Sequence, residues 1–143
     1  MTDMQLQPFI YFYGRCEEAL AHYRDALGGT FEVLQRNGES PESNDHRFDP
    51  AFRDKVSYAT FAAPGLSFAA SDGPRARTID PAEGNISLAL TIRDLAFAEG
   101  AFAKLTDGGS VKEPLGPAPW GGTFGIVHDR FGTEWIVTVP PSA

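Results

Sequence analysis

The same succession of a strand, a helix, a pair of glycines and further strands occurs twice along this chain. The first helical pattern covers 15–27 and ends at the glycine pair 28–29. The second covers 95–106 and ends at the pair 108–109, which lies 80 residues further along. Glycine pairs often end helices, so the repeated order of elements is the stronger observation. It predicts two related modules.

Both helices are predicted from apolar residues that recur at helical spacing. The first helix has Glu17 and Glu18 in its first turn, where the helix dipole favours negative charge. The second helix follows Asp94, whose side chain can cap it. The apolar residues are Cys16, Ala19, Leu20, Tyr23 and Leu27 in the first helix, and Leu95, Ala98, Phe102 and Leu105 in the second.

Short runs rich in β-branched and aromatic residues predict four strands in each half of the chain. They cover 7–13, 30–36, 56–62 and 66–70, then 86–92, 110–113, 123–128 and 133–139. One helix and four strands are too few to close a core alone, so we expect the two sheets to curve around a shared interior. The predicted fold is α+β, with two βαβββ modules at about 6–72 and 85–140 in a single domain, 1–143.

Two segments lack this patterning. Residues 37–54 are polar and contain Pro41 and Pro50, which predicts a long loop with a helical turn near 50–53. Such a loop is either a functional lid or merely mobile. Residues 73–84 are expected to link the modules.

Composition excludes several classes of function. The net charge of −7 and the pI near 4.8 disfavour binding to nucleic acids or anionic membranes. No apolar run is long enough to span a bilayer, and residues 1–5 have neither the basic nor the apolar region of a secretory signal, so none is expected. The single cysteine, Cys16, excludes an internal disulfide bond. We therefore expect a cytoplasmic protein.

Three motifs in order give the chain a resemblance to a known family. They are Gly14-Arg15-Cys16-Glu17-Glu18-Ala19 with His22-Tyr23 and Ala26-Leu27-Gly28-Gly29, then Ser71-Asp72, then Trp120 and Phe124-Gly125 with Asp129-Arg130-Phe131-Gly132-Thr133-Glu134-Trp135. From about Leu6 to Val139, the chain resembles the PhnB-like branch of the glyoxalase/bleomycin-resistance (vicinal oxygen chelate) superfamily. His22 departs from it, since the family more often has phenylalanine there.

The resemblance implies paired βαβββ modules with curved mixed sheets, usually assembled as a homodimer with sites in the concave sheets. It does not imply one activity. The superfamily includes lyases, dioxygenases, thiol transferases that inactivate fosfomycin, and drug-sequestering proteins without catalysis. Some PhnB-like members carry methyltransferase labels, but this chain has no glycine-rich cofactor loop, and no cofactor is expected.

Metal-dependent members of the superfamily hold a divalent ion with His and Glu side chains on four strands. By alignment with the helix and strand patterns, those positions fall near Pro8, Tyr58, Ser87 and Ile136. Pro8 and Ile136 have no donor atom, and neither tyrosine nor serine is a good ligand. Shifting the alignment by one residue brings in no histidine or carboxylate. We therefore expect no metal at this site.

Three residues are weak catalytic candidates: Glu134, His128 and Tyr58. Strand alternation places Glu134 on the same face as Ile136 and turns Trp135 towards the helix. Enclosure would raise the pKa of Glu134 and let it act as an acid or base; otherwise it is a partly exposed strand residue. His128 is either a base near neutral pH or a hydrogen-bonded turn residue.

The predicted ligand-binding set combines aromatic, apolar and acidic side chains. Its members are Phe12, Tyr58, Trp120, Glu134 and Ile136, with Phe124 as a further aromatic. Trp120 lies in a Gly/Pro-rich loop, which suits a pocket lid or a dimer contact. Cys16 lies near a helix N-terminus, which can lower a thiol pKa, but it belongs to the helix's apolar stripe, so core packing is expected for it. His22 and His46 are expected to be surface or capping residues.

Two functional hypotheses follow. In the first, the chain binds or sequesters a small, partly apolar molecule in a sheet cavity without the usual metal. In the second, it is a metal-independent or unconventionally metallated lyase-type or transferase-type enzyme that uses Glu134 or His128 with Tyr58. A clustering of titratable groups around one cavity would favour the enzyme.

Overall fold

A computed structural model describes residues 2–39, 46 and 48–142. The chain divides into two compact units, Met1–Arg77 and Thr78–Ala143, and each is described by itself. The boundary lies within segment 73–84, which the sequence suggested as a linker. No helix among the described residues has the length and apolar character that a bilayer crossing requires.

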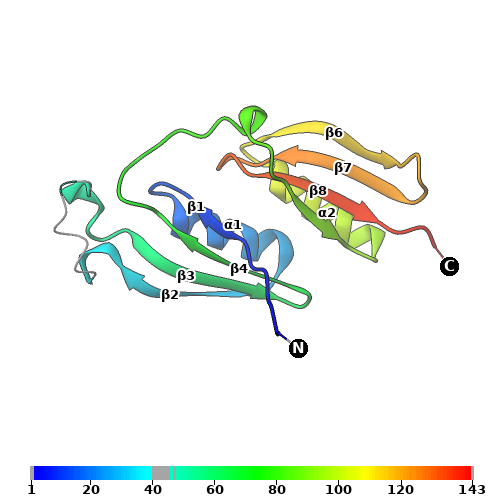
Figure 1. Ribbon diagram of the computed structural model, residues 1–143. Helices are drawn as coiled ribbons and strands as arrows, with labels where there is room; N and C mark the ends of the chain where they lie inside the picture. The colour runs from blue at the N-terminus through cyan, green and yellow to red at the C-terminus, as the bar shows by residue number, and fades with distance from the viewer. Residues whose placement is uncertain (1, 40–45, 47, 143) are drawn as a thin grey trace. The chain divides into compact units, whose positions relative to one another are not determined.

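Unit 1 is a four-stranded mixed sheet with one helix against it (Figure 1). The strand order is β1-β4-β3-β2, with β1 parallel to β4 and the other neighbours antiparallel. Its elements are β1 (Phe9–Tyr11), α1 (Cys16–Leu27), β2 (Thr30–Arg36), η1 (Asn37–Glu39), η3 (Pro50–Phe52), β3 (Val56–Ala63) and β4 (Leu66–Ser71).

Unit 2 repeats this topology. Its strand order is β5-β8-β7-β6, again with the first strand parallel to the last and the other neighbours antiparallel. Its elements are η4 (Pro81–Glu83), β5 (Leu88–Thr91), α2 (Leu95–Thr106), β6 (Ser110–Pro117), β7 (Thr123–His128) and β8 (Glu134–Val139). The predicted α+β fold with two βαβββ modules is thereby confirmed.

The main differences from the predicted elements lie in two edge strands. β1 ends at Tyr11, because Tyr13 has a positive φ of 49° and the chain turns there towards α1. β6 continues to Pro117, past the predicted end at residue 113, with two register shifts on the way. The predicted helical turn near residue 50 is η3. Residues 40–45 and 47 of the expected loop lie outside the described residues.

Each helix buries the face that its apolar pattern predicts. In unit 1, Tyr23 on α1 meets Phe61 and Phe68 edge-on, at ring-centroid distances of 6.5 and 6.0 Å. In unit 2, the buried side chains of α2 lie over β7 and β8, whose own buried residues include Val127 and Trp135. Each sheet therefore has one face covered by its helix, and we call the opposite face the open face.

The glycine pair that ends each helix has a packing reason. A Cβ atom on Gly29 would overlap the carbonyl oxygen of Ala62, and one on Gly109 would overlap that of His128. In both units the chain leaving the helix therefore passes directly against the backbone of a strand. Only glycine fits such a close approach.

The two helices begin differently. Asp94 caps α2 locally, accepting hydrogen bonds from the backbone N–H groups of Ala96 and Phe97. At the start of α1, Arg15 gives no side-chain cap. Instead, the carboxylate of Asp72, which is 1% exposed, accepts from the backbone N–H of Gly14, Cys16 and Val56 at 2.7–2.8 Å. The Ser71-Asp72 motif thus ties α1 to the end of β4 and the start of β3.

Candidate functional site

Four polar side chains form a row across the open face of the unit 2 sheet. They are Ser87, just before β5, Lys112 on β6, His128 on β7 and Glu134 on β8. His128 and Glu134 are direct partners in the antiparallel pairing of β7 with β8. Leu88 pairs with Trp135, which brings Ser87 beside Glu134. We call these four residues the polar row.

The Glu134 carboxylate is the centre of the polar row. Its Oε1 lies 2.7 Å from His128 Nε2 and 3.1 Å from Lys112 Nζ, and its Oε2 accepts from the Ser87 hydroxyl. The side chains of Glu134 and His128 are 16% and 15% exposed, whereas that of Lys112 is 54% exposed. Three neighbours therefore hold one largely buried carboxylate.

These contacts determine the ionisation of Glu134. The Ser87 hydroxyl, followed by the His128 ring, lowers the pKa of Glu134 to about 2, against the opposing effect of partial burial. The expectation that enclosure would raise this pKa is therefore wrong, because hydrogen bonds to the charged form outweigh the loss of solvation. Glu134 is a carboxylate at neutral pH, suited to orienting its neighbours and not to donating a proton.

A buried aspartate shapes the turn that brings His128 opposite Glu134. Asp129 accepts from the backbone N–H of Phe131 and Thr133 and, through its other oxygen, from the indole N–H of Trp135. It is 4% exposed. The indole is thereby held on the helix-covered face, as alternation along β8 predicts, and Glu134 is turned to the open face.

Apolar side chains continue the open face beyond the polar row. Alternation along β8 and β7 places Ile136 and Phe124 on the same face as Glu134. Trp120, in the loop before β7, has its ring 4.9 Å from that of Phe124 and is 68% exposed. One open face thus combines hydrogen-bonding groups at one end with apolar and aromatic groups further along.

The open face of unit 1 has a different character. Phe9 lies 5.2 Å from Tyr11 and 6.2 Å from Tyr58 between ring centroids, and Tyr13 continues the series beside Tyr11. Phe9, Tyr11 and Tyr58 are 45%, 50% and 39% exposed. We call these four residues the aromatic stripe. Tyr58 and Glu134 belong to different units, so the expectation that they share one face stays a prediction.

Several candidate residues lie away from the open faces. Phe12, predicted to bind ligand, is 4% exposed and packs 5.9 Å from Tyr23 in the core of unit 1, so any influence on a ligand would act through the core. Cys16 is completely buried, and this burial, with the Asp72 charge as a smaller cause, raises the pKa of its thiol. His46 is exposed, and His22 is partly buried beside Tyr23.

The residues present do not fit the metal that the superfamily implies. Within the described residues, no group of three or more His, Cys, Asp and Glu side chains could hold an ion. His128 and Glu134 supply two good donors, but Ser87 is a weak one, and the Lys112 ammonium beside the carboxylate would repel a cation. A catalytic zinc site normally needs about three protein ligands. No step is therefore assigned to a metal.

Sequence reasoning proposed Glu134 and His128 separately and missed their pairing. The predicted strands 123–128 and 133–139 would place residue 128 opposite 133, whereas in the structure β8 begins at Glu134 and His128 pairs with Glu134, so the pairing was one residue beyond the predicted register. Ser87 was considered only as a poor metal ligand. Lys112 was missed altogether, since it lies in β6 between Val111 and Glu113, where the pairing with β7 shifts register.

Comparisons with known proteins agree with this architecture. The family model of the Glyoxalase/Bleomycin resistance protein/Dioxygenase superfamily matches residues 5–137. Among curated proteins, Protein YjdN of Escherichia coli (strain K12) is 25% identical over 95% of both chains.

Two solved structures are similar over nearly their whole length. The crystal structure of protein PA1353 from Pseudomonas aeruginosa has a TM-score of 0.81 and 34% identity, covering 98% of this chain and 100% of that one. A PhnB protein from Bacillus cereus, described as a putative 3-demethylubiquinone-9 3-methyltransferase, has a TM-score of 0.74 and 26% identity, covering 95% and 99%. The chain therefore belongs to the Glyoxalase/Bleomycin resistance protein/Dioxygenase superfamily, within its PhnB-like branch.

Proposed function

We propose that this PhnB-like protein binds a small, partly apolar molecule on the open face of unit 2, without the superfamily's usual metal. The observation that carries the proposal is the convergence of Ser87, His128 and Lys112 on the Glu134 carboxylate, next to apolar Ile136. A few placed polar groups beside an apolar surface are typical of sites for small molecules.

The polar row would hold the polar end of the ligand. The Lys112 ammonium has three N–H donors, and its hydrogen bond to Glu134 uses one of them. The Lys112 side chain is also about half exposed, so a ligand can reach it. The second ring nitrogen of His128 is a further potential donor or acceptor. A ligand with an acceptor oxygen near Lys112 could lay its apolar part along Ile136 and Phe124, with Trp120 beside it.

A thermal-shift screen of small metabolites, run with and without divalent metals, tests this proposal. Compounds that stabilise the wild-type protein should lose most of that effect in Glu134→Gln, because the row loses the charge that orders Lys112 and His128. Glu83→Gln is the matched control, since it removes one negative charge at an exposed position on η4, outside the open face. Equal shifts in both variants would contradict a site at the polar row.

A second candidate function is metal-independent acid–base catalysis at the same row. The 2.7 Å contact between His128 Nε2 and Glu134 Oε1 favours it, because a carboxylate that orients an imidazole is a recurring arrangement for a general base. With a turned-over compound in hand, His128→Gln should abolish turnover and keep binding within about threefold. If turnover in His128→Gln falls only as far as binding does, His128 serves binding and not catalysis, and the sequestering function remains the explanation.

The absence of a resident metal is also part of the proposal. Elemental analysis after gentle purification should find far less than one Zn²⁺, Ni²⁺, Mn²⁺ or Fe²⁺ per chain. Near one equivalent, lost in both Ser87→Ala and Glu134→Gln, would contradict the argument and favour an unconventionally metallated enzyme.

We further propose that the protein is a homodimer, as the family resemblance implies. Sedimentation at micromolar concentration should give about twice the chain mass of 15.5 kDa. A particle of the single-chain mass would contradict this assembly.

A further inference from the structure

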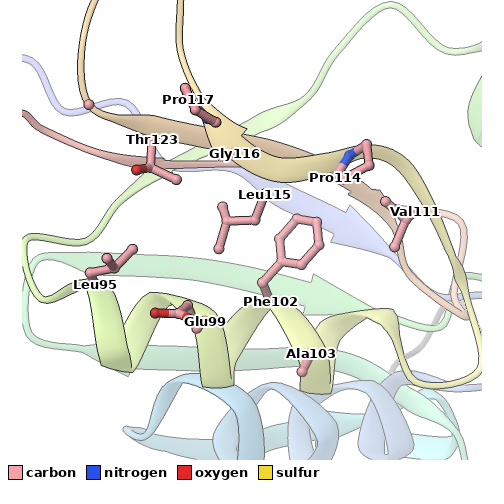
Figure 2. Close-up of a pocket in the computed structure, with 11 residues that line it drawn as sticks. Leu95, Glu99, Phe102, Ala103, Val111, Pro114, Leu115, Gly116, Pro117 and Thr123 are labelled. Atoms are coloured by element: carbon pink, nitrogen blue, oxygen red, sulfur yellow. The ribbon is translucent and has the colours of Figure 1, made fainter.

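A groove of about 710 Å³ lies between α2 and β6, on the helix-covered side of the unit 2 sheet (Figure 2). In Figure 2, Leu115 points from β6 towards α2, and beside it the Phe102 ring points from α2 towards β6. The groove is lined mainly by apolar side chains, namely Leu95, Phe102, Val111, Pro114, Leu115 and Pro117. It is separate from the polar row, which lies on the opposite face of the same sheet.

The local sequence explains why the groove exists. Between residues 113 and 116, the pairing of β6 with β7 shifts register, and Pro114 and Pro117 interrupt the donors of this edge strand. On β7, next to two of the lining residues, a Cβ on Gly125 would lie 2.8 Å from Phe102 Cε2 and 2.9 Å from Leu115 Cα. The glycine thus lets the ring lie close to β7, and the groove is part of the folded unit.

One charged side chain interrupts this apolar lining. Glu99 follows Leu95 by one helical turn and precedes Ala103 by another, so it shares their face of α2. Within residues 2–39, 46 and 48–142, no hydrogen bond or ion pair involves its carboxylate. The groove therefore offers an apolar surface, an aromatic ring and one negative charge without a cation.

We propose that the α2–β6 groove binds a small amine with an aromatic or branched aliphatic body. Its volume lies within the range of about 300–1,000 Å³ that is typical of small-molecule sites. The body of the ligand contacts Phe102 and Leu115, and its ammonium group pairs with Glu99. This site goes beyond the proposed function, because the chemistry of the polar row plays no part in it.

Three matched probes test the proposal: phenethylamine, phenethyl alcohol and phenylacetate, which share a ring and a chain but differ in charge. Titration calorimetry with the whole chain at low ionic strength should rank the amine first, about fivefold tighter than the alcohol, as expected for one exposed ion pair. Phenylacetate should bind most weakly. The preference for the amine should shrink at high salt, because exposed charges are screened.

Variants locate the effect. Glu99→Gln should abolish the preference for the amine while leaving the affinity for phenethyl alcohol unchanged. Glu83→Gln, at an exposed position on η4, changes the net charge equally and should have no effect. Ala103→Trp, at an exposed position on the groove wall, should abolish binding of both probes. Equal affinity for all three probes, no binding of the amine, or binding that survives Ala103→Trp would overturn the proposal.

Discussion

Unit 1 and unit 2 arrange four strands and one helix in the same order, yet the open faces of their sheets carry different side chains. Unit 1 presents the aromatic stripe, in which Phe9, Tyr11 and Tyr58 are each about half exposed. Unit 2 presents the polar row, centred on the largely buried carboxylate of Glu134. The topology is therefore common to both units, whereas this hydrogen-bonded polar cluster belongs to unit 2.

The comparison separates positions that the fold requires from positions that are free to vary. Gly29 and Gly109 both pass against a strand backbone, so both units need a residue without a side chain there. The open faces contribute little to the core of their own unit, which lies under the helix. Side chains on them can therefore differ without changing the topology.

The sharpest test of the shared framework compares the two aspartates that cap the helices. Asp72→Ala should lower the free energy of unfolding by about 3–5 kcal/mol, because three backbone N–H groups, two of them buried, lose their acceptor. Asp94→Ala, at an exposed cap, should cost about 1 kcal/mol. Urea unfolding followed by circular dichroism measures both. Similar costs for the two variants would contradict the long-range role of Asp72.

The glycine pairs provide the next test. Gly29→Ala and Gly109→Ala should each cost about 2–4 kcal/mol, because the new methyl group overlaps a backbone carbonyl that cannot move alone. Gly100→Ala is the control within α2, where an added Cβ has no neighbour within 4 Å. It should stabilise the helix by about 0.5–1 kcal/mol. Gly29 also has a positive φ of 91°, whereas Gly109 does not, so Gly29→Ala should be the costlier of the two. A cost below about 1 kcal/mol at Gly109 would contradict the dependence of unit 2 on this close approach.

The polar row predicts an acid dependence that belongs to unit 2. The folded-state pKa of Glu134 is about 2, below the ordinary value of 4.5, so its contribution to stability is fully present above pH 4.5 and is lost as the pH falls through 2. Glu134→Gln should therefore cost about 1–2 kcal/mol at neutral pH and almost nothing near pH 2. Unfolding monitored by tryptophan fluorescence, in which buried Trp135 becomes exposed while Trp120 is already exposed, measures this, and a pH-independent difference would contradict it.

The aromatic stripe predicts the smallest effect. Tyr58→Phe should change the free energy of unfolding by less than about 0.5 kcal/mol, because the ring is 39% exposed and no described residue forms a hydrogen bond with its hydroxyl. Its unfolding should also show the same pH dependence as the wild type. A cost as large as that of Glu134→Gln would mean that the open faces are not as different as their side chains suggest.

The elements and topology could be predicted from the sequence because they depend on patterns within short segments. Both helices were predicted to within one residue, and the buried alternation of Trp135 and Val137 on β8 follows from a period of two. The duplicated order of elements gave the module architecture. Asp94 was also expected as a cap, since its target N–H groups lie only two and three residues away.

The candidate site could be predicted only in part, because it depends on register and on competing energies. Placing Lys112 requires the exact shift between β6 and β7, which no local pattern encodes. The direction in which the pKa of Glu134 shifts depends on whether hydrogen bonds to its carboxylate outweigh the loss of solvation. Two of the donors of these hydrogen bonds, on His128 and Lys112, come from other strands. The role of Asp72 at α1 was hidden because its partners Gly14 and Cys16 lie more than fifty residues away.

The complete burial of Cys16 has a practical consequence for labelling chemistry. The thiol is enclosed between α1 and its sheet with a raised pKa, so little thiolate forms at neutral pH and maleimide reagents should not reach it in the folded protein. The natural chain can therefore be labelled at an introduced cysteine without first replacing Cys16. A single cysteine introduced in place of exposed Trp120 would take up a fluorophore or spin label selectively, beside the apolar end of the proposed site.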